Sequence, residues 1–154
     1  MRSDSLKVLL NLIRELNFFR GSFLIWSEFY YPSTLQLSEV VKVLIEPTKT
    51  NKILFDKVGL GLHEALVNAV KHGNRCNNSK KIRVRRIITP KWFIWQIQDE
   101  GSGTPIYLRN YALPINLDAS GGRGLYIISQ CFDDIRWSSK GNRIQLACRK
   151  EIKN

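Results

Sequence analysis

The sequence predicts an α+β fold in which a mostly antiparallel sheet carries helices on one face. The 154 residues are 44% hydrophobic, which suits a single domain with one core. The spacing of apolar residues changes along the chain, from alternation in short aromatic or β-branched stretches to helical spacing in longer ones. The resulting element order is β-α-α-β-β-loop-α-β-β, which is typical of a sheet layered against helices.

The first strand and the first helix are separated by a proline. The stretch WSEFYY at 26–31 is short and rich in aromatic residues, as strands are. Pro32 interrupts it, and Ser33 is a candidate cap for a helix over 34–46 with apolar residues at helical spacing. Pro47 ends this helix.

A second, longer helix follows and runs to His72, with Gly73 as its stop signal. One of three polar residues caps its start: Thr48, Thr50 or Asn51. Wound at about 100° per residue, the segment 51–72 gathers one apolar face that would pack against the core. That face consists of Val58, Leu62, Ala65, Leu66, Ala69 and Val70.

The second half of the domain is predicted to be strands around one helix. Alternating apolar residues on either side of a Thr-Pro turn indicate a hairpin. Residues 100–123 are a long irregular stretch, and a loop of that size in a compact domain is usually functional. The expected elements are strands at 82–88, 92–99, 134–138 and 143–149, and a helix at 124–131.

Residues 1–25 are expected to be a helical extension of the domain at 26–150. Charged residues interrupt the apolar ones and predict an amphipathic helix over roughly residues 4–19 rather than a signal peptide. This helix would pack on the domain or on a second subunit, with contact to a membrane surface as the alternative. No stretch of the sequence approaches the ~20 apolar residues of a membrane span.

The cysteines and the net charge bound the environment and the partners. Three cysteines without a CxxC pair are most simply reduced thiols of a cytoplasmic protein. A formal net charge of +11 favours anionic partners such as nucleotides, nucleic acid or acidic proteins. The only local basic cluster, KKIRVRR at 80–86, is either one basic face of a strand that binds nucleic acid or a solvated face.

Three polar residues of the long helix form a column opposite its apolar face. Glu64, Asn68 and Lys71 fall within an arc of about 60°. By itself, this column is compatible with an ordinary solvated helix face.

Two glycine-containing segments follow this helix in the sequence. QDEGSGTP at 98–105 places Asp99 at a strand end before Gly101 and Gly103, where a backbone can approach a ligand closely and a carboxylate can accept a hydrogen bond from an amine. GGRGLYI at 121–127 places glycines before a helix, where backbone N–H groups can bind phosphate. Either segment alone is common in proteins without a nucleotide site.

Together the three segments resemble the GHKL (Bergerat) ATP-binding superfamily, over roughly residues 26–150. HEALVNAVKHGN is similar to the E-A-x-x-N-A-x-x-H-G pattern of its anti-sigma-factor serine/threonine kinase branch, and GGRGLYIISQCFDDIRW is similar to that branch's G-x-G-L ending. The resemblance implies the two-layer α/β sandwich of the Bergerat fold and binding of ATP with Mg²⁺.

The resemblance also implies a role for each motif. Glu64 would be the general base, and the Asn68 amide oxygen would bind Mg²⁺. Lys71 would contact phosphate or remain solvated, and Asp99 would accept a hydrogen bond from the adenine amino group. Residues 104–121 would be a lid over the phosphates. The backbone would approach the base and ribose at Gly101 and Gly103, and the phosphates at Gly122, Arg123, Gly124 and Leu125.

The partners implied by the resemblance are proteins. The chain would phosphorylate a Ser or Thr of an anti-anti-sigma (STAS) protein, sequester a sigma factor, and form a homodimer in the cytoplasm. Two other functions remain open from the residues: a nucleotide-gated binding module without kinase activity, and a basic nucleic-acid-binding domain. Glu64 argues against the first of these.

Overall fold

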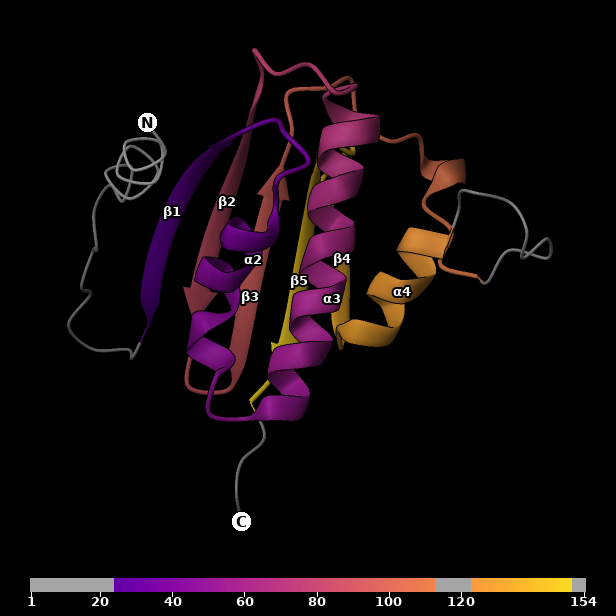
Figure 1. Ribbon diagram of the computed structural model, residues 1–154. Coiled ribbons are helices and arrows are strands. Elements are labelled where there is room, and N and C mark those ends of the chain that lie inside the picture. Colours follow the sequence, from indigo (N-terminus) through magenta and orange to yellow (C-terminus); the bar gives the residue numbers. More distant parts are fainter. Residues whose placement is uncertain (1–23, 113–122, 151–154) are drawn as a thin grey trace, which may run out of the picture.

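The computed structural model describes residues 24–112 and 123–150 and confirms the predicted fold class (Figure 1). The strands are β1 (Ile25–Pro32), β2 (Lys81–Ile88), β3 (Trp92–Gln98), β4 (Asp134–Trp137) and β5 (Arg143–Arg149). The helices are α2 (Ser38–Ile45), α3 (Lys52–Asn68) and α4 (Arg123–Cys131), with short turns of helix η1 (Glu46–Thr48), η2 (Ala69–Gly73) and η3 (Ile106–Leu108).

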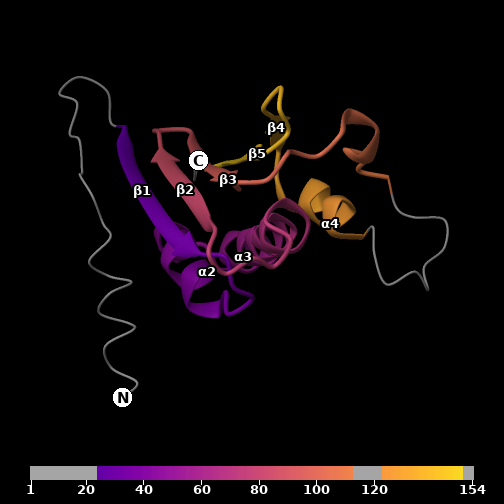
Figure 2. The same cartoon turned by 90° about the horizontal axis from the view of Figure 1, so that it is seen from above.

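The five strands form one antiparallel sheet in the order β1-β2-β3-β5-β4. The predicted hairpin is β2–β3, which pairs Arg83 with Gln98 and Ile88 with Phe93. Figure 2 shows that all three helices lie on the same side of this sheet. The molecule is therefore a two-layer sandwich, and α3 lies between α2 and α4 across the sheet (Figures 1 and 2).

The core lies between the sheet and the apolar face of α3. All six apolar residues assigned to that face from helical spacing are buried, which confirms the predicted orientation of the helix. Trp95 of β3 is fully buried beneath the helices, and its indole N–H donates a hydrogen bond to the carbonyl of Leu44 in α2 at 3.1 Å. This bond satisfies the one polar group of the largest core side chain.

Helices α3 and α4 pack closely because a glycine lies at their contact. A Cβ on Gly61 would lie 2.5 Å from the ring of Phe132 and 2.7 Å from the Cβ of Cys131. Any larger residue at this position would push the two helices apart. The contact therefore sets the position of α4 relative to the polar column of α3.

Three details of the helices differ from the sequence prediction. The first helix begins at Ser38 rather than at residue 34, and Ser33 does not cap it. Ser33 is instead buried at the end of β1, where its backbone N–H bonds to Lys80, because strand pairing continues past Pro32. The long helix continues into a π-helical turn, η2, which includes Gly73 rather than stopping before it. Among its candidate caps, the Asn51 side chain accepts a hydrogen bond from the Leu54 N–H at 3.0 Å.

The basic cluster of β2 is partly neutralised within the sheet. Glu28 of β1 pairs with both Arg83 and Arg85 on the neighbouring strand, and the contact to Arg85 is 2.9 Å. Arg86 points to the other face of the sheet and donates a hydrogen bond to the Val43 carbonyl near the end of α2 at 2.8 Å. These contacts assign the three arginines a structural role and weaken the case for a nucleic-acid site there.

Two predicted segments lie outside the described residues. These are the N-terminal helix at 4–19 and residues 113–122, which comprise the second part of the predicted lid and the predicted phosphate contact Gly122. In the part of the chain that the structure describes, none of the helices has the length and apolar character needed to cross a membrane.

Candidate functional site

The site begins where the polar column of α3 meets the start of α4. Glu64 and Asn68 are half-buried, one helical turn apart. A Cβ on Gly124 would lie 3.2 Å from Glu64 Oε2 and 3.3 Å from the Asn68 amide. The α4 backbone therefore passes directly beside both side chains. The sequence segments predicted to hold a catalytic base, a metal ligand and a phosphate-binding helix start are in contact.

The second part of the site is the turn after β3, which lies against the end of α3. A Cβ on Gly73 would lie 2.3 Å from the Asp99 carboxyl carbon, and a Cβ on Gly101 would lie 2.2 Å from the Gly73 carbonyl oxygen. The two glycines therefore allow the Asp99 turn to pack against the backbone of η2. This contact brings the strand-end carboxylate to the same cleft as the α3 column.

Hydrogen bonds fix the Asp99 turn from two directions. The Gly101 N–H donates to Asp99 Oδ1 at 2.7 Å. On the other side, Asn142 in the β4–β5 turn accepts a hydrogen bond from the Asp99 N–H at 3.0 Å, and its amide donates to the Asp99 carbonyl at 3.2 Å. The Gly101 N–H therefore orients the carboxylate directly, while Asn142 holds the Asp99 backbone from the other side.

The partial burial of Asp99 makes its charged form costly. Burial raises the pKa of this carboxyl, although the hydrogen bond from the Gly101 N–H and the positive charge of Lys140 act in the opposite direction. A hydrogen-bond donor from a ligand would compensate for the missing water. This is the electrostatic environment expected for a carboxylate that recognises an amine.

Gly103 turns the chain away from β3 and into the lid. Its φ is +94°, and a Cβ there would lie 1.9 Å from the Lys140 carbonyl oxygen. Only glycine fits both the backbone conformation and the space. The close approach places Thr104 beside Gly141, whose carbonyl accepts a hydrogen bond from the Thr104 N–H at 2.9 Å.

A cavity of about 720 Å³ lies between the Asp99 turn and α4; Asn68 lines it, whereas Glu64 and Gly124 lie beside Asn68 but outside its lining. Its apolar lining comes from the sheet and from α4 and could enclose a planar base: Ile97, Ile144, Leu125 and Ile128. Its polar lining includes Asp99, Asn68, Thr104 and His72. A volume in the range of roughly 300–1,000 Å³ and a few polar groups in an apolar wall are typical of a small-molecule site.

The described part of the lid is held against the sheet by a hydrogen bond between two aromatic side chains and by the contacts of one arginine. The Trp137 indole N–H of β4 donates to the Tyr111 hydroxyl at 2.6 Å. Arg109 donates to the Thr104 carbonyl at 2.9 Å, and its guanidinium lies 5.5 Å from the centre of the Trp137 ring. Tyr107, in η3, lines the cavity while 80% of its surface remains exposed. The described part of the lid therefore contains one short ordered element, η3.

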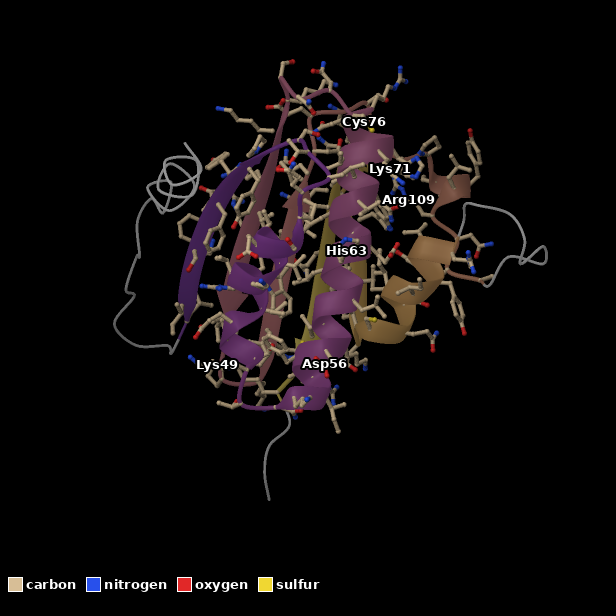
Figure 3. The ribbon with its side chains drawn as sticks, in the orientation of Figure 1. Lys49, Asp56, His63, Lys71, Cys76 and Arg109 are labelled. Atoms are coloured by element: carbon tan, nitrogen blue, oxygen red, sulfur yellow. The ribbon has the colours of Figure 1, made fainter. Side chains whose placement is uncertain are left out.

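Two of the predicted phosphate-contacting side chains lie at the edge of the site. Lys71 and Arg123 are exposed, and the described cavity lining includes neither of them. Figure 3 shows Lys71 near the same end of α3 as Arg109 of the lid, whereas Asp56 lies at the other end of the helix. Gly101 is buried against η2 rather than in the cavity lining. Gly103 and Leu125 line the cavity, as expected for residues beside a ligand.

Sequence reasoning missed three residues that shape the site. Asn74 and Asn142 bond to the turn that contains Asp99, and Arg109 joins the lid to the β4–β5 turn. Asn74 follows Gly73 at the end of a helix, where an asparagine has the appearance of an ordinary cap. Asn142 lies in a predicted turn, and nothing in the sequence pairs Arg109 with residues 29 and 30 positions later.

The matched family agrees with this geometry. Residues 34–148 match the family model described as the histidine kinase-like ATPase domain, which covers most of the chain and all parts of the site. The chain belongs to this family. A search of curated proteins found no significant match.

Membership in this ATPase family implies that the domain binds ATP, and the residues of the cavity fit that ligand. The apolar walls can enclose adenine, and Asp99 is the fixed acceptor beside them. Toward Gly124, Glu64 and Asn68 present a carboxylate and an amide oxygen, the donors that Mg²⁺ accepts together with phosphate oxygens and water. The described residues contain no group of three or more His, Cys, Asp or Glu side chains that could hold a metal ion by themselves.

Proposed function

We propose that the chain is an ATP- and Mg²⁺-dependent serine/threonine protein kinase of the anti-sigma-factor type. It transfers phosphate to a Ser or Thr of an anti-anti-sigma (STAS) protein and sequesters a sigma factor. It acts in the cytoplasm as a homodimer. The net charge of +11 favours partners with acidic surfaces, because complementary charge speeds their encounter.

One observation carries the kinase assignment: Glu64 Oε2 and the Asn68 amide lie together beside the backbone of Gly124 at the start of α4. A nucleotide-gated binding module needs a metal ligand and a phosphate-binding helix start, but it has no use for a carboxylate between them. The N-terminus of a nine-residue helix carries the partial positive charge and the free N–H groups that favour phosphate. A general base at this position lies near the site of phosphoryl transfer.

Each residue has a simple role in this reaction. Asp99 accepts a hydrogen bond from the adenine amino group and thereby positions the nucleotide. The start of α4 donates N–H groups to the phosphates, and Asn68 holds Mg²⁺ by its amide oxygen. Glu64 accepts the proton of the Ser or Thr hydroxyl as the hydroxyl oxygen bonds to the γ-phosphorus, and the bond from that phosphorus to the β–γ bridging oxygen breaks, so that ADP leaves. When bound, Mg²⁺ would neutralise part of the phosphate charge. Positioning of the reactants and neutralisation of charge account for most phosphoryl-transfer catalysis.

The experiment is a transfer assay with γ-labelled ATP and STAS proteins that carry a candidate acceptor serine. Glu64→Gln removes the base and keeps the shape of the side chain. We expect transfer to fall by about 10²-fold or more, as for loss of a general base. We expect ATP affinity to stay within about twofold, because the adenine contacts are elsewhere.

Asp56→Asn is the matched control, since it removes one acidic charge from an exposed position of the same helix far from the site (Figure 3). It should transfer phosphate at the wild-type rate. A STAS protein with its serine changed to alanine should accept no label. Unchanged transfer in Glu64→Gln would refute the base assignment, and absence of transfer by the wild type to any STAS protein would favour a nucleotide-gated binding module.

A further inference from the structure

Asn74 is a buried polar residue next to the ATP cleft, and the proposed mechanism gives it no role. Asn74 is 0% exposed, and both the nitrogen and the oxygen of its side-chain amide form hydrogen bonds. The amide nitrogen donates to the Lys81 carbonyl at the start of β2 at 3.0 Å, and the amide oxygen accepts from the Glu100 N–H after β3 at 2.8 Å. Its own backbone N–H caps the end of η2 by bonding to the Ala69 carbonyl at 2.8 Å.

These bonds connect Asn74 to the carboxylate that faces the nucleotide base. Glu100 is the residue between Asp99 and Gly101, and the Gly101 N–H holds Asp99 Oδ1 at 2.7 Å. Asn74 holds the Glu100 N–H, which belongs to the peptide directly before the one that carries the Gly101 N–H, so it restrains the position of the Gly101 N–H from the interior. Gly73, the residue before Asn74, packs against the same carboxylate. Asn74 therefore holds the Asp99 turn without touching the ligand itself.

We propose that Asn74 is a positioning residue that sets the selectivity of the site for adenine over other purines. It does so by fixing the Asp99 carboxylate in the direction of the exocyclic amine. The inference depends on the Asp99 side of the cavity being the adenine site, and it is independent of whether the chain transfers phosphate to a protein.

Selectivity requires that the carboxylate cannot turn away. Adenine presents an amino donor at the position where hypoxanthine presents a carbonyl acceptor. A fixed carboxylate rejects the carbonyl because two acceptors would face each other without a proton between them. A carboxylate on a loosened turn can rotate away, so the competing base loses less affinity. Discrimination by a fixed polar group is therefore larger than discrimination by a mobile one.

The test compares dissociation constants for ATP and inosine triphosphate, measured by titration calorimetry with Mg²⁺. We expect the wild type to prefer ATP by about 100-fold, in line with sites built to bind one polar group. Asn74→Ala should weaken ATP binding by about tenfold and change inosine triphosphate binding little, so that the preference falls to about tenfold. Asp99→Asn is the benchmark for complete loss of the preference.

Asn77→Ala is the matched control. Asn77 lies in the same loop and is exposed, and its side-chain oxygen accepts hydrogen bonds from the Ser79 N–H at 2.9 Å and from the Ser79 hydroxyl at 2.7 Å. The Asn77→Ala variant should prefer ATP over inosine triphosphate as strongly as the wild type does. If Asn74 has a purely structural role, Asn74→Ala should lower the fraction of folded protein but leave the ratio of the dissociation constants for ATP and inosine triphosphate unchanged. That result would overturn the proposal.

A measurement on the wild type keeps the proposal testable if Asn74→Ala does not fold. Hydrogen exchange followed by nuclear magnetic resonance should show strong protection of the Glu100 amide and fast exchange at the exposed Ser102. Equal exchange at the two positions would contradict the inference. Failure of the wild type to bind ATP at all would remove the adenine site itself, and with it both this inference and the proposed function. Loss of protein phosphorylation alone would leave the inference intact.

Discussion

The two ends of the proposed ATP cleft, the Asp99 end assigned to the base and the Glu64 end assigned to the phosphates, differ in how their polar side chains are held. At the base end, Asp99 lies in a turn fixed by backbone hydrogen bonds, by the buried Asn74 and by contact with Gly73. At the phosphate end, the Glu64 side chain is 26% exposed, and its carboxylate lies 3.9 Å from His63 Nδ1. At the base end, hydrogen bonds within the protein already fix the polar side chain without a ligand. At the phosphate end, the polar groups are partly solvated and accessible to a nucleotide and a metal ion.

This difference predicts two kinds of mutational effect. Substitutions at the base end should change the stability of the protein and its choice of base together, because the same contacts do both. Substitutions at the phosphate end should change metal dependence and transfer while the ligand-free protein stays as stable as before. The predictions below, in order of expected size, test this separation.

Gly101→Ala should have the largest effect on the ligand-free protein. The new Cβ would lie 2.2 Å from the Gly73 carbonyl oxygen, and backbone cannot move aside as a flexible side chain can. We expect the free energy of unfolding to fall by about 3 kcal/mol, the upper part of the range for overpacking. Urea denaturation checks this value.

Gly59→Ala is the control for Gly101→Ala. Its Cβ would meet two side chains, the end of Ile45 at 3.3 Å and Val41 at 4.0 Å, and alanine favours the α3 helix by ~1 kcal/mol over glycine. It should therefore be neutral or slightly stabilising. If the two substitutions lowered the free energy of unfolding by similar amounts, the Asp99 turn would not be packed more closely than the surface of α3.

Asn68→Ala should act on the nucleotide complex rather than on the free protein. With ATP alone, the variant should gain as much stability as the wild type. Upon addition of Mg²⁺, the wild type should gain about 1–2 kcal/mol more, within the roughly 2.7 kcal/mol of a ligand at 100 times its dissociation constant, and the variant should not. Differential scanning fluorimetry with and without Mg²⁺ distinguishes these cases. An equal gain from Mg²⁺ in both proteins would rule out Asn68 as the metal ligand.

The pH dependence of stability should carry a smaller signature of Asp99. Burial raises its pKa in the folded protein above the ordinary value of 3.8, so the folded state binds the proton more tightly than the unfolded state. Its contribution to stability is present below pH 3.8 and is lost as the pH rises through the folded-state pKa. Asp99→Asn lacks this titration. The stability of the wild type relative to the variant should therefore decline across this interval, and a rise would contradict the direction of the shift.

The fold could be predicted from the sequence further than the site could. The spacing of Val58, Leu62 and Leu66 was enough to orient α3, because burial of one helix face follows from periodicity. The pairing of Glu28 with Arg83 and Arg85 needed the β1–β2 register, which no local pattern supplies. For this reason the basic cluster remained ambiguous until the strands were placed.

The same limit applies to the cleft. Asp99 before two glycines, and Glu64 one turn before Asn68, indicate ligand contacts because these residue types suit a nucleotide in local segments. Asn74 acts through Lys81 and Glu100, which belong to other elements, and its role could be recognised only from the tertiary contacts. The roles of the remaining site residues stay predictions that ligand binding must test.

The most direct test of the account is the thermal unfolding of the wild type with and without ATP and Mg²⁺. Binding to the folded state at ~100 times the dissociation constant should add roughly 2.7 kcal/mol and shift the transition upward. ATP should stabilise the protein far more than inosine triphosphate at the same concentration. An unchanged transition at saturating ATP and Mg²⁺ would contradict the central claim that this cleft is a nucleotide site.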